Sequence, residues 1–267
     1  MNIGMNIFDG IDIKRQVELF RQMGIDRIFW ESERPEFDQT MQLLRENGIV
    51  CEALHAPYNG INDMWGDDEE AGQKMLNRLK DSVDKCAKYG IPVTVVHLSS
   101  GRPMPAINEN GLRRYEALFD YAVEKGVTVA LENQRYLENL AYFMEHYSTP
   151  GFCWDNGHQY CCLNGVDLMG MFGHRLVALH IHDNRNQLDT DDHLIPFDGN
   201  IPFEEVARQL AESGYEGTLM LEIGKLSAID GKQIYGDMSD ETYVKRAAEA
   251  ARRLADMVEA YRKNFPK

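Results

Sequence analysis

Short apolar runs alternate along the whole chain with longer segments whose apolar residues recur at helical spacing. The segments at 12–24, 69–90 and 112–126 show this spacing, and each closes with a glycine, as helix C-termini often do. An alternation of strand and helix is typical of a parallel sheet. The eight runs are NIGMNIF, DRIFWES, IVCEALHA, VTVVHLSS, VTVALEN, GFCWDNG, LVALHIHD and TLMLEIG.

Eight strand–helix units in a chain of 267 residues predict an α/β protein with a single (β/α)₈ TIM barrel rather than an open, doubly wound sheet. A GxGxxG sequence does not follow the first run, which argues against a dinucleotide-binding fold. Linkers and low-complexity tracts are also lacking, so we expect one domain over residues 1–267. The last helix, expected from about 240 to 263, is long enough to cover a partner subunit. A homo-oligomer is therefore compatible with the sequence.

Composition narrows the class of protein further. The first residues, MNIGMNIFDG, do not resemble a signal peptide, and no run approaches the roughly 20 apolar residues of a membrane span, so we expect a soluble cytoplasmic protein without a membrane partner. The net charge of −15 disfavours nucleic acid as a partner, because such binding depends on Lys and Arg contacts to phosphate. A small molecule is the expected ligand.

The five cysteines are odd in number and lack CxxC spacing, so neither disulfides nor a structural zinc site is expected. Cys161 and Cys162 follow His158 closely. Two adjacent thiols are poorly placed to bind one metal ion together, and we expect both to be buried in a short helix.

Six consecutive strands end in side chains that commonly bind metals. Strand residues alternate between two faces, and in each of these strands one face carries small or apolar residues followed by a histidine or a carboxylate. A single residue of this kind more often caps a helix or satisfies a buried hydrogen bond. In a barrel, however, all six converge at the mouth where active sites lie. The six are His55, His97, Glu132, Asp155, His180 and Glu222.

Three of these six residues are carboxylates, and burying them together without a counter-charge is unfavourable. A divalent cation bound by Glu132, Asp155, His180 and Glu222 would resolve the conflict. This oxygen-rich set suits Mn²⁺, Mg²⁺ or Co²⁺, while additional histidines would favour Zn²⁺.

The same residues resemble a known family, the xylose isomerase-like TIM barrels, over nearly the whole chain. This family includes ketose 3-epimerases, hydroxypyruvate isomerase, 3-dehydroshikimate dehydratases and, more distantly, endonuclease IV. VALEN, WDNGH, ALHIHD and LMLEIG are similar to the motifs that carry its metal ligands. The resemblance implies the ligands Glu132, Asp155, His180 and Glu222.

The resemblance also implies substrate contacts around the metal. His158 of WDNGH and the loop DDHLIPFDGNIPF, with Asp191 and His193, are placed at the mouth beside His55 and His97. ENQRYLE is similar to an epimerase stretch in which the second Glu, here Glu138, contacts substrate. Arg185, just beyond HIHDN, is equally plausible as a substrate contact and as a solvated loop residue.

Several activities are compatible with this pattern. Isomerisation or epimerisation of a sugar or sugar phosphate removes a proton next to a carbonyl, and a metal stabilises the resulting enediolate. Glu132 and Glu222 would act as the two bases. Nine positions also match the ligands of three zinc ions in endonuclease IV, which would allow a phosphodiesterase. A dehydratase-like lyase and a non-catalytic metal- or sugar-binding barrel are further alternatives. The acidic composition and the lack of basic loops favour the isomerase or epimerase.

Overall fold

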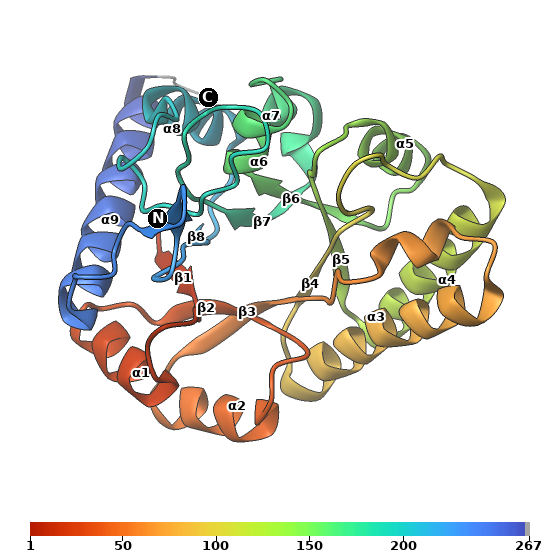
Figure 1. The fold of residues 1–267 in the computed structure, drawn as a ribbon, viewed down its shortest axis with the longest axis horizontal. Coiled ribbons are helices and arrows are strands. Elements are labelled where there is room, and N and C mark those ends of the chain that lie inside the picture. The colour runs from red at the N-terminus through yellow and green to blue at the C-terminus, as the bar shows by residue number, and fades with distance from the viewer. Residues whose placement is uncertain (265–267) are drawn as a thin grey trace.

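Eight short parallel strands surround the centre of the computed structural model, which describes residues 1–264 (Figure 1). Each of the eight apolar runs forms one strand, and helices follow the strands as the pattern predicts. The elements are β1 Ile3–Asn6, α1 Ile13–Gln22, β2 Arg27–Glu31, α2 Phe37–Glu46, β3 Val50–His55, the 3₁₀ helix η1 Ile61–Trp65, α3 Glu69–Tyr89, β4 Val93–Val96, α4 Glu109–Lys125, β5 Thr128–Glu132, α5 Glu138–His146, β6 Gly151–Asp155, α6 Asn156–Cys161, α7 Leu168–Phe172, the 3₁₀ helix η2 Gly173–Arg175, β7 Leu176–His180, α8 Phe203–Ser213, β8 Leu219–Leu221, β9 Ala228–Ile229, β10 Lys232–Gln233 and α9 Asp240–Asn264.

The strands are ordered β7-β6-β5-β4-β3-β2-β1-β8, with every neighbouring pair parallel. The two ends of this order meet at a seam, where a single bridge joins Ile181 to Leu221. At the seam the Ile181 N–H donates to the Met220 carbonyl and the Glu222 N–H donates to the Ile181 carbonyl, both at 2.9 Å. The predicted (β/α)₈ barrel is therefore confirmed as a nearly closed ring.

Local sequence signals explain where several helices begin and end. Side chains of Asp12, Asp68 and Asn108 accept backbone N–H groups at the starts of α1, α3 and α4. Gly90 and Gly126 end α3 and α4 in the left-handed region, with φ of 68° and 69°. Helix α4 begins three residues before the predicted boundary of 112, because the Asn108 cap lies upstream of the first apolar residue.

Aromatic packing fixes the loop after β3 against helix α4. The Trp65 ring lies beside Tyr115 and Phe143, and its indole N–H donates to the Leu98 carbonyl at 2.7 Å. A Cβ at Gly111 would lie 1.9 Å from the Trp65 ring, so only glycine permits this approach. The loop that leads to the barrel mouth is thereby anchored in the core.

Two long loops at the carboxyl ends of β7 and β8 shape one side of the mouth. The Asp183 carboxylate holds the first by accepting N–H groups of Asn184, Gly199 and Ile201 at 2.7–3.0 Å. The second contains the β9–β10 hairpin, and the buried Lys225 ammonium donates to two of its downstream carbonyls. Helix α9 packs against α8 and α1 (Figure 1). No helix within residues 1–264 has the length and apolar content needed to cross a bilayer.

Candidate metal centre and active site

The four residues expected to bind a cation come together at the mouth of the barrel. Glu132, Asp155 and His180 are the last residues of β5, β6 and β7, and Glu222 directly follows β8. One side-chain donor atom from each lies within 4.8 Å of the donors of the other three. The alternation of strand faces thus places four donors from consecutive strands around one point.

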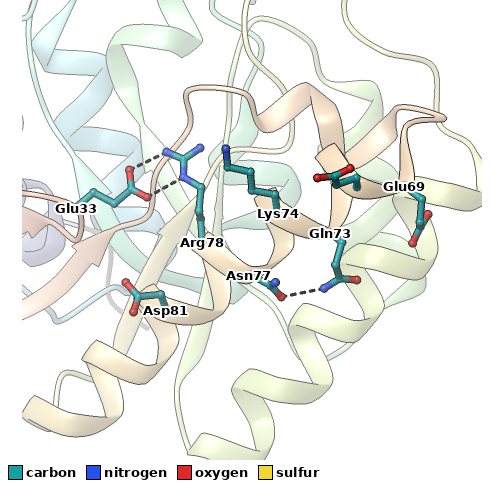
Figure 2. Close-up of a pocket in the computed structure, with 8 residues that line it drawn as sticks. Glu33, Glu69, Gln73, Lys74, Asn77, Arg78 and Asp81 are labelled. Carbon is teal, nitrogen blue, oxygen red and sulfur yellow. Dashed lines mark hydrogen bonds and ion pairs between the residues drawn. The ribbon is translucent and has the colours of Figure 1, made fainter.

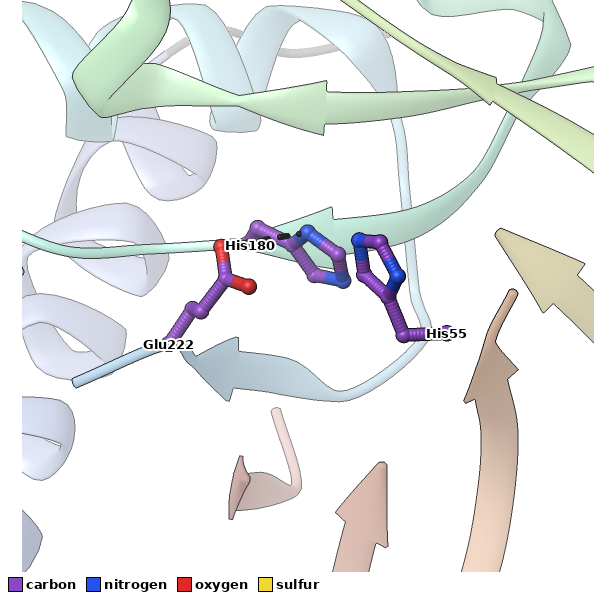
Figure 3. A group of neighbouring side chains, drawn as sticks. All are labelled: His55, His180 and Glu222. Carbon is purple, nitrogen blue, oxygen red and sulfur yellow. Dashed lines mark ion pairs between the residues drawn. The ribbon is translucent and has the colours of Figure 1, made fainter. Parts of the chain in front are cut away.

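Two further histidines extend this group across the mouth. His55 and His97 place their Nε2 atoms 3.3 and 3.1 Å from Glu132 Oε2, and the two Nε2 atoms are 3.1 Å apart. Glu132 Oε2 is also 3.4 Å from His180 Nδ1. The Glu132 carboxylate therefore belongs both to this group and to the one formed with Asp155, His180 and Glu222. Figure 3 shows the side chains of His55, His180 and Glu222 converging.

A third group lies on the other side of Asp155. His182, Asp191 and His193 have donor atoms within 4.8 Å of one another. Asp191 also contacts His158, with Oδ2 3.0 Å from His158 Nε2. The predicted loop residues Asp191 and His193 are therefore brought to the mouth.

Four of these histidines are oriented by a carbonyl oxygen. Because a carbonyl can only accept, the facing Nδ1 carries a proton, which leaves Nε2 as the nitrogen with a free lone pair whenever the ring is neutral. In each ring Nε2 faces a neighbouring carboxylate, which is the arrangement of a metal-binding histidine. The pairs are His55 with the Ala56 carbonyl, His158 with that of Asn133, His182 with that of Asp183, and His193 with that of Glu222, at 2.8–3.3 Å.

Several buried polar atoms in these groups make no hydrogen bond of good geometry within the described part of the chain, although carboxylate oxygens lie 3.2–3.4 Å from His180 Nδ1 and His182 Nε2. They include Asp155 Oδ2, both ring nitrogens of His180, His182 Nε2 and Asp191 Oδ1. Unsatisfied buried polar atoms are costly and rare in proteins. Their convergence on shared points, together with the mixture of carboxylates and imidazoles, fits divalent cations.

The electrostatics of the site follow from this crowding. Burial alone would raise the pKa of Glu132, but the charges of His97 and His180 hold it well below its ordinary value. Burial likewise opposes protonation of His180 and His193, yet neighbouring groups outweigh it: Cys153, Glu222 and Glu132 raise the pKa of His180 well above 6.5, and Asp191 raises that of His193 to about 10. Without a cation, protons supply the positive charge that these carboxylates require.

Asparagine side chains extend the sheet at the ligand-bearing strand ends. The Asn133 amide donates to the Asp155 carbonyl at 2.8 Å and accepts the Asp155 N–H at 2.9 Å. Asn156 makes the same pair of hydrogen bonds to the backbone N–H and carbonyl of His182, and Asn6 makes it to Ile223, which follows Glu222. We call such a pair of bonds a bracket. Each bracket supplies the hydrogen bonds that a neighbouring strand would make if backbone pairing continued. It therefore fixes the backbone, and with it the direction in which the adjacent donor side chain points.

We expect Asn133→Ala to lower metal affinity by about 10–100-fold, the usual effect of losing a group that orients a ligand. Asn62→Ala is the matched control, because Asn62 makes the same two-bond bracket to Ser100, which is in none of the donor groups. Isothermal titration with Mn²⁺, beside thermal unfolding of both variants, separates ligand positioning from general stability. Equal affinities in the two variants would contradict this role for Asn133.

A cavity of about 600 Å³ opens above the donor groups. It is lined by most residues expected to contact substrate: His55, His97, His158, Asp191 and His193. Glu138 and Arg185 are not among its lining residues. Glu138 is exposed at the start of α5, and the Arg185 guanidinium is bound by Asp192 at 3.1–3.2 Å.

Sequence reasoning missed two residues of the site. His182 is fully buried, with Nε2 3.2 Å from Asp155 Oδ1, and its ring stacks on that of His193. The signal was present, because His182 lies two residues after His180 and so shares its face. Gln134 lines the cavity, its Nε2 3.1 Å from His97 Nε2, and the same spacing pointed to it, because it lies two residues after Glu132.

A second, open hollow lies on the outer side of α3 (Figure 2). Its charges are largely paired, as in the two 2.7 Å bonds between the Arg78 guanidinium and Glu33. Its lining residues are not part of the donor groups at the barrel mouth. The candidate functional site is therefore the barrel mouth.

The fold and site define a (β/α)₈ barrel whose strand ends carry donor groups suited to divalent cations. The model of the family "Xylose isomerase-like TIM barrel" matches residues 8–254, and the chain belongs to that family.

Three relatives illustrate its range. The uncharacterised protein Rv0498 of Mycobacterium tuberculosis is 38% identical over 241 residues, covering 77% of this chain and 80% of its own. A "Probable endonuclease 4" of Cenarchaeum symbiosum is 33% identical over 82 residues, 30% of this chain and 28% of its own. Among solved structures, D-psicose 3-epimerase of Clostridium cellulolyticum H10, crystallised with D-tagatose, matches with a TM-score of 0.78 and 16% identity over 97% of this chain and 99% of its own.

Proposed function

We propose that this protein is a divalent-metal-dependent isomerase or epimerase of uncharged sugars. The observation that carries the proposal is the position of Glu132 and Glu222. Both carboxylates line one cavity and approach His180 Nδ1 from different strands, at 3.4 and 3.2 Å. The family and the epimerase fold support the same class of reaction.

In the proposed reaction one carboxylate removes a proton from the carbon next to the sugar carbonyl, and the other returns it. Return to the opposite face of the same carbon gives an epimer, while return to the neighbouring carbon gives an isomer. A cation held by Glu132, Asp155, His180 and Glu222 would supply the positive charge that stabilises the developing oxyanion. Mn²⁺, Mg²⁺, Co²⁺ and Zn²⁺ are all compatible with these donors.

The charges of the cavity favour an uncharged sugar over a sugar phosphate. Six carboxylates but only two arginines line it. Arg34 is engaged by both Asp9 and Glu31, and Arg135 lies 3.6–3.8 Å from Asp189 and Asp191. With one divalent ion bound and the lining histidines neutral, the lining stays net negative, so a phosphate dianion would be repelled.

The test is incubation of the metal-loaded protein in D₂O with matched ketoses and ketose phosphates. We expect deuterium to enter the uncharged sugar at a carbon next to the carbonyl, and to enter its phosphate ester much more slowly. Mass spectrometry and NMR locate the label. Exchange confined to the phosphate esters would overturn the preference for uncharged sugars, and no exchange with any sugar would refute the proposed reaction.

A second candidate is a metal-dependent phosphodiesterase, favoured by one observation: donor groups for more than one cation share Glu132 or adjoin Asp155. Three divalent ions would make the cavity lining net positive and attractive to phosphate. We favour one catalytic ion. Anomalous scattering that shows three ions per chain, together with cleavage of a duplex containing an abasic site, would reverse this preference.

A further inference from the structure

Two adjacent thiols lie where helix α6 ends. Cys161 is buried, Cys162 is partly exposed, and their Sγ atoms are 3.3 Å apart. We expected both to be buried, but α6 stops at Cys161 and turns Cys162 toward the surface. The pair therefore combines a thiol that dissolved reagents can reach with a second thiol in contact with it.

Backbone groups of this pair hold the loop that brings Asp191 to the mouth. The Cys161 carbonyl accepts the Asp189 N–H at 3.0 Å, and the Cys162 N–H donates to the His158 carbonyl at 2.9 Å. The Asp189 carboxylate is in turn bound by Arg102 at 2.9–3.1 Å. The peptide between the two cysteines thus lies between His158 and the segment that carries Asp191.

We propose that Cys161 and Cys162 form a reversible oxidation site, which hydrogen peroxide converts to a disulfide and a thiol reductant restores. The Cys162 thiolate attacks one peroxide oxygen, which breaks the O–O bond, releases hydroxide and leaves a sulfenic acid. The Cys161 sulfur then attacks the Cys162 sulfur, loses its proton and displaces the second oxygen as water. In total, two thiols and one peroxide give one disulfide and two waters.

The geometry favours a labile disulfide over a permanent one. A trans peptide fixes adjacent Cα atoms about 3.8 Å apart, whereas ordinary disulfides join Cα atoms about 4.4–6.8 Å apart. The resulting strain makes the bond easier to reduce. Closing the ring also twists the peptide between the cysteines, so the Cys161 carbonyl and the Cys162 N–H move. Oxidation should therefore release the loop around Asp189.

The experiment treats the full-length protein with limiting hydrogen peroxide and follows both mass and loop exposure. We expect a loss of about 2 Da, the two thiol hydrogens, mapped to the peptide containing Cys161 and Cys162 and reversed by dithiothreitol. Trypsin should then cut after Arg185 faster than in the reduced protein. Neither readout depends on the substrate or on turnover.

Three variants provide the controls. Cys161→Ser and Cys162→Ser should each lose the 2 Da species and the change in cleavage, whereas Cys51→Ser, a buried cysteine on β3, should retain both. Only higher oxides of Cys162 in the parent, or the same mass loss in the Cys162→Ser variant, would overturn the oxidation site. A mapped disulfide with unchanged cleavage at Arg185 would refute its coupling to the loop.

Discussion

Replacing Glu132 or Glu222 with glutamine should lower turnover of the correct sugar by about 10²–10⁴-fold, the range expected when a general base is lost. Glutamine keeps the size of the side chain and one oxygen that can bind a cation, but it cannot accept the substrate proton. If the two carboxylates act on opposite faces, each variant should lose deuterium exchange in one stereochemical direction more than in the other. Exchange is followed by NMR in D₂O.

Metal content must be measured in each of these variants, because both side chains are also expected ligands. Glu52→Gln is the matched control: Glu52 lies on β3, pairs with Arg27 at 2.9 Å and belongs to none of the donor groups. Variants at Glu132 and Glu222 that hold metal and exchange protons at the parent rate would show that both residues are ligands only.

Removing the metal should abolish turnover, and restoring it should stabilise the fold by about 2.7 kcal/mol at a free concentration 100 times Kd. Binding should also release protons, because neighbouring groups raise the pKa of His180 and His193 and a cation requires the unprotonated rings. Affinity is therefore expected to rise as pH increases from 6 to 8. Calorimetry in buffers of different ionisation enthalpy measures the protons released.

Asp155→Asn should weaken binding strongly, since Asp155 Oδ2 has no hydrogen-bonding partner in the described residues and is expected to face the cation. His146→Asn is the control, because His146 is exposed on α5 and lies away from the donor groups. A protein that takes up neither Mn²⁺ nor Zn²⁺ from solutions containing them would contradict the metal site.

The barrel and the donor groups could be predicted from sequence for the same physical reason. Strand side chains alternate with a period of two, so one face of each apolar run could be followed to its end at His55, Glu132 or His180. Parallel strands in a closed ring then bring these ends together. Neither step requires knowledge of any loop.

Loop geometry set the limit of prediction. Arg185 follows the strand by five residues, and its partner Asp192 depends on a turn that the loop makes later. Glu138 was assigned by similarity alone, and the start of α5 leaves it in solvent. The asparagine brackets depend on the register between neighbouring strands, which a single sequence does not specify. His182 differs, because the period of two reaches it if the run continues beyond His180.

The seam between β7 and β8 gives the proposed cation a mechanical role. Elsewhere in the ring neighbouring strands share a register of three or more paired residues, but here one bridge joins Ile181 to Leu221. His180 and Glu222 flank this weakest junction, with Nδ1 and Oε2 3.2 Å apart. An ion bound by both residues would cross-link β7 and β8 where backbone hydrogen bonding between them is sparse. Separation of β7 from β8 would then require the ion to dissociate, so the two processes would be coupled.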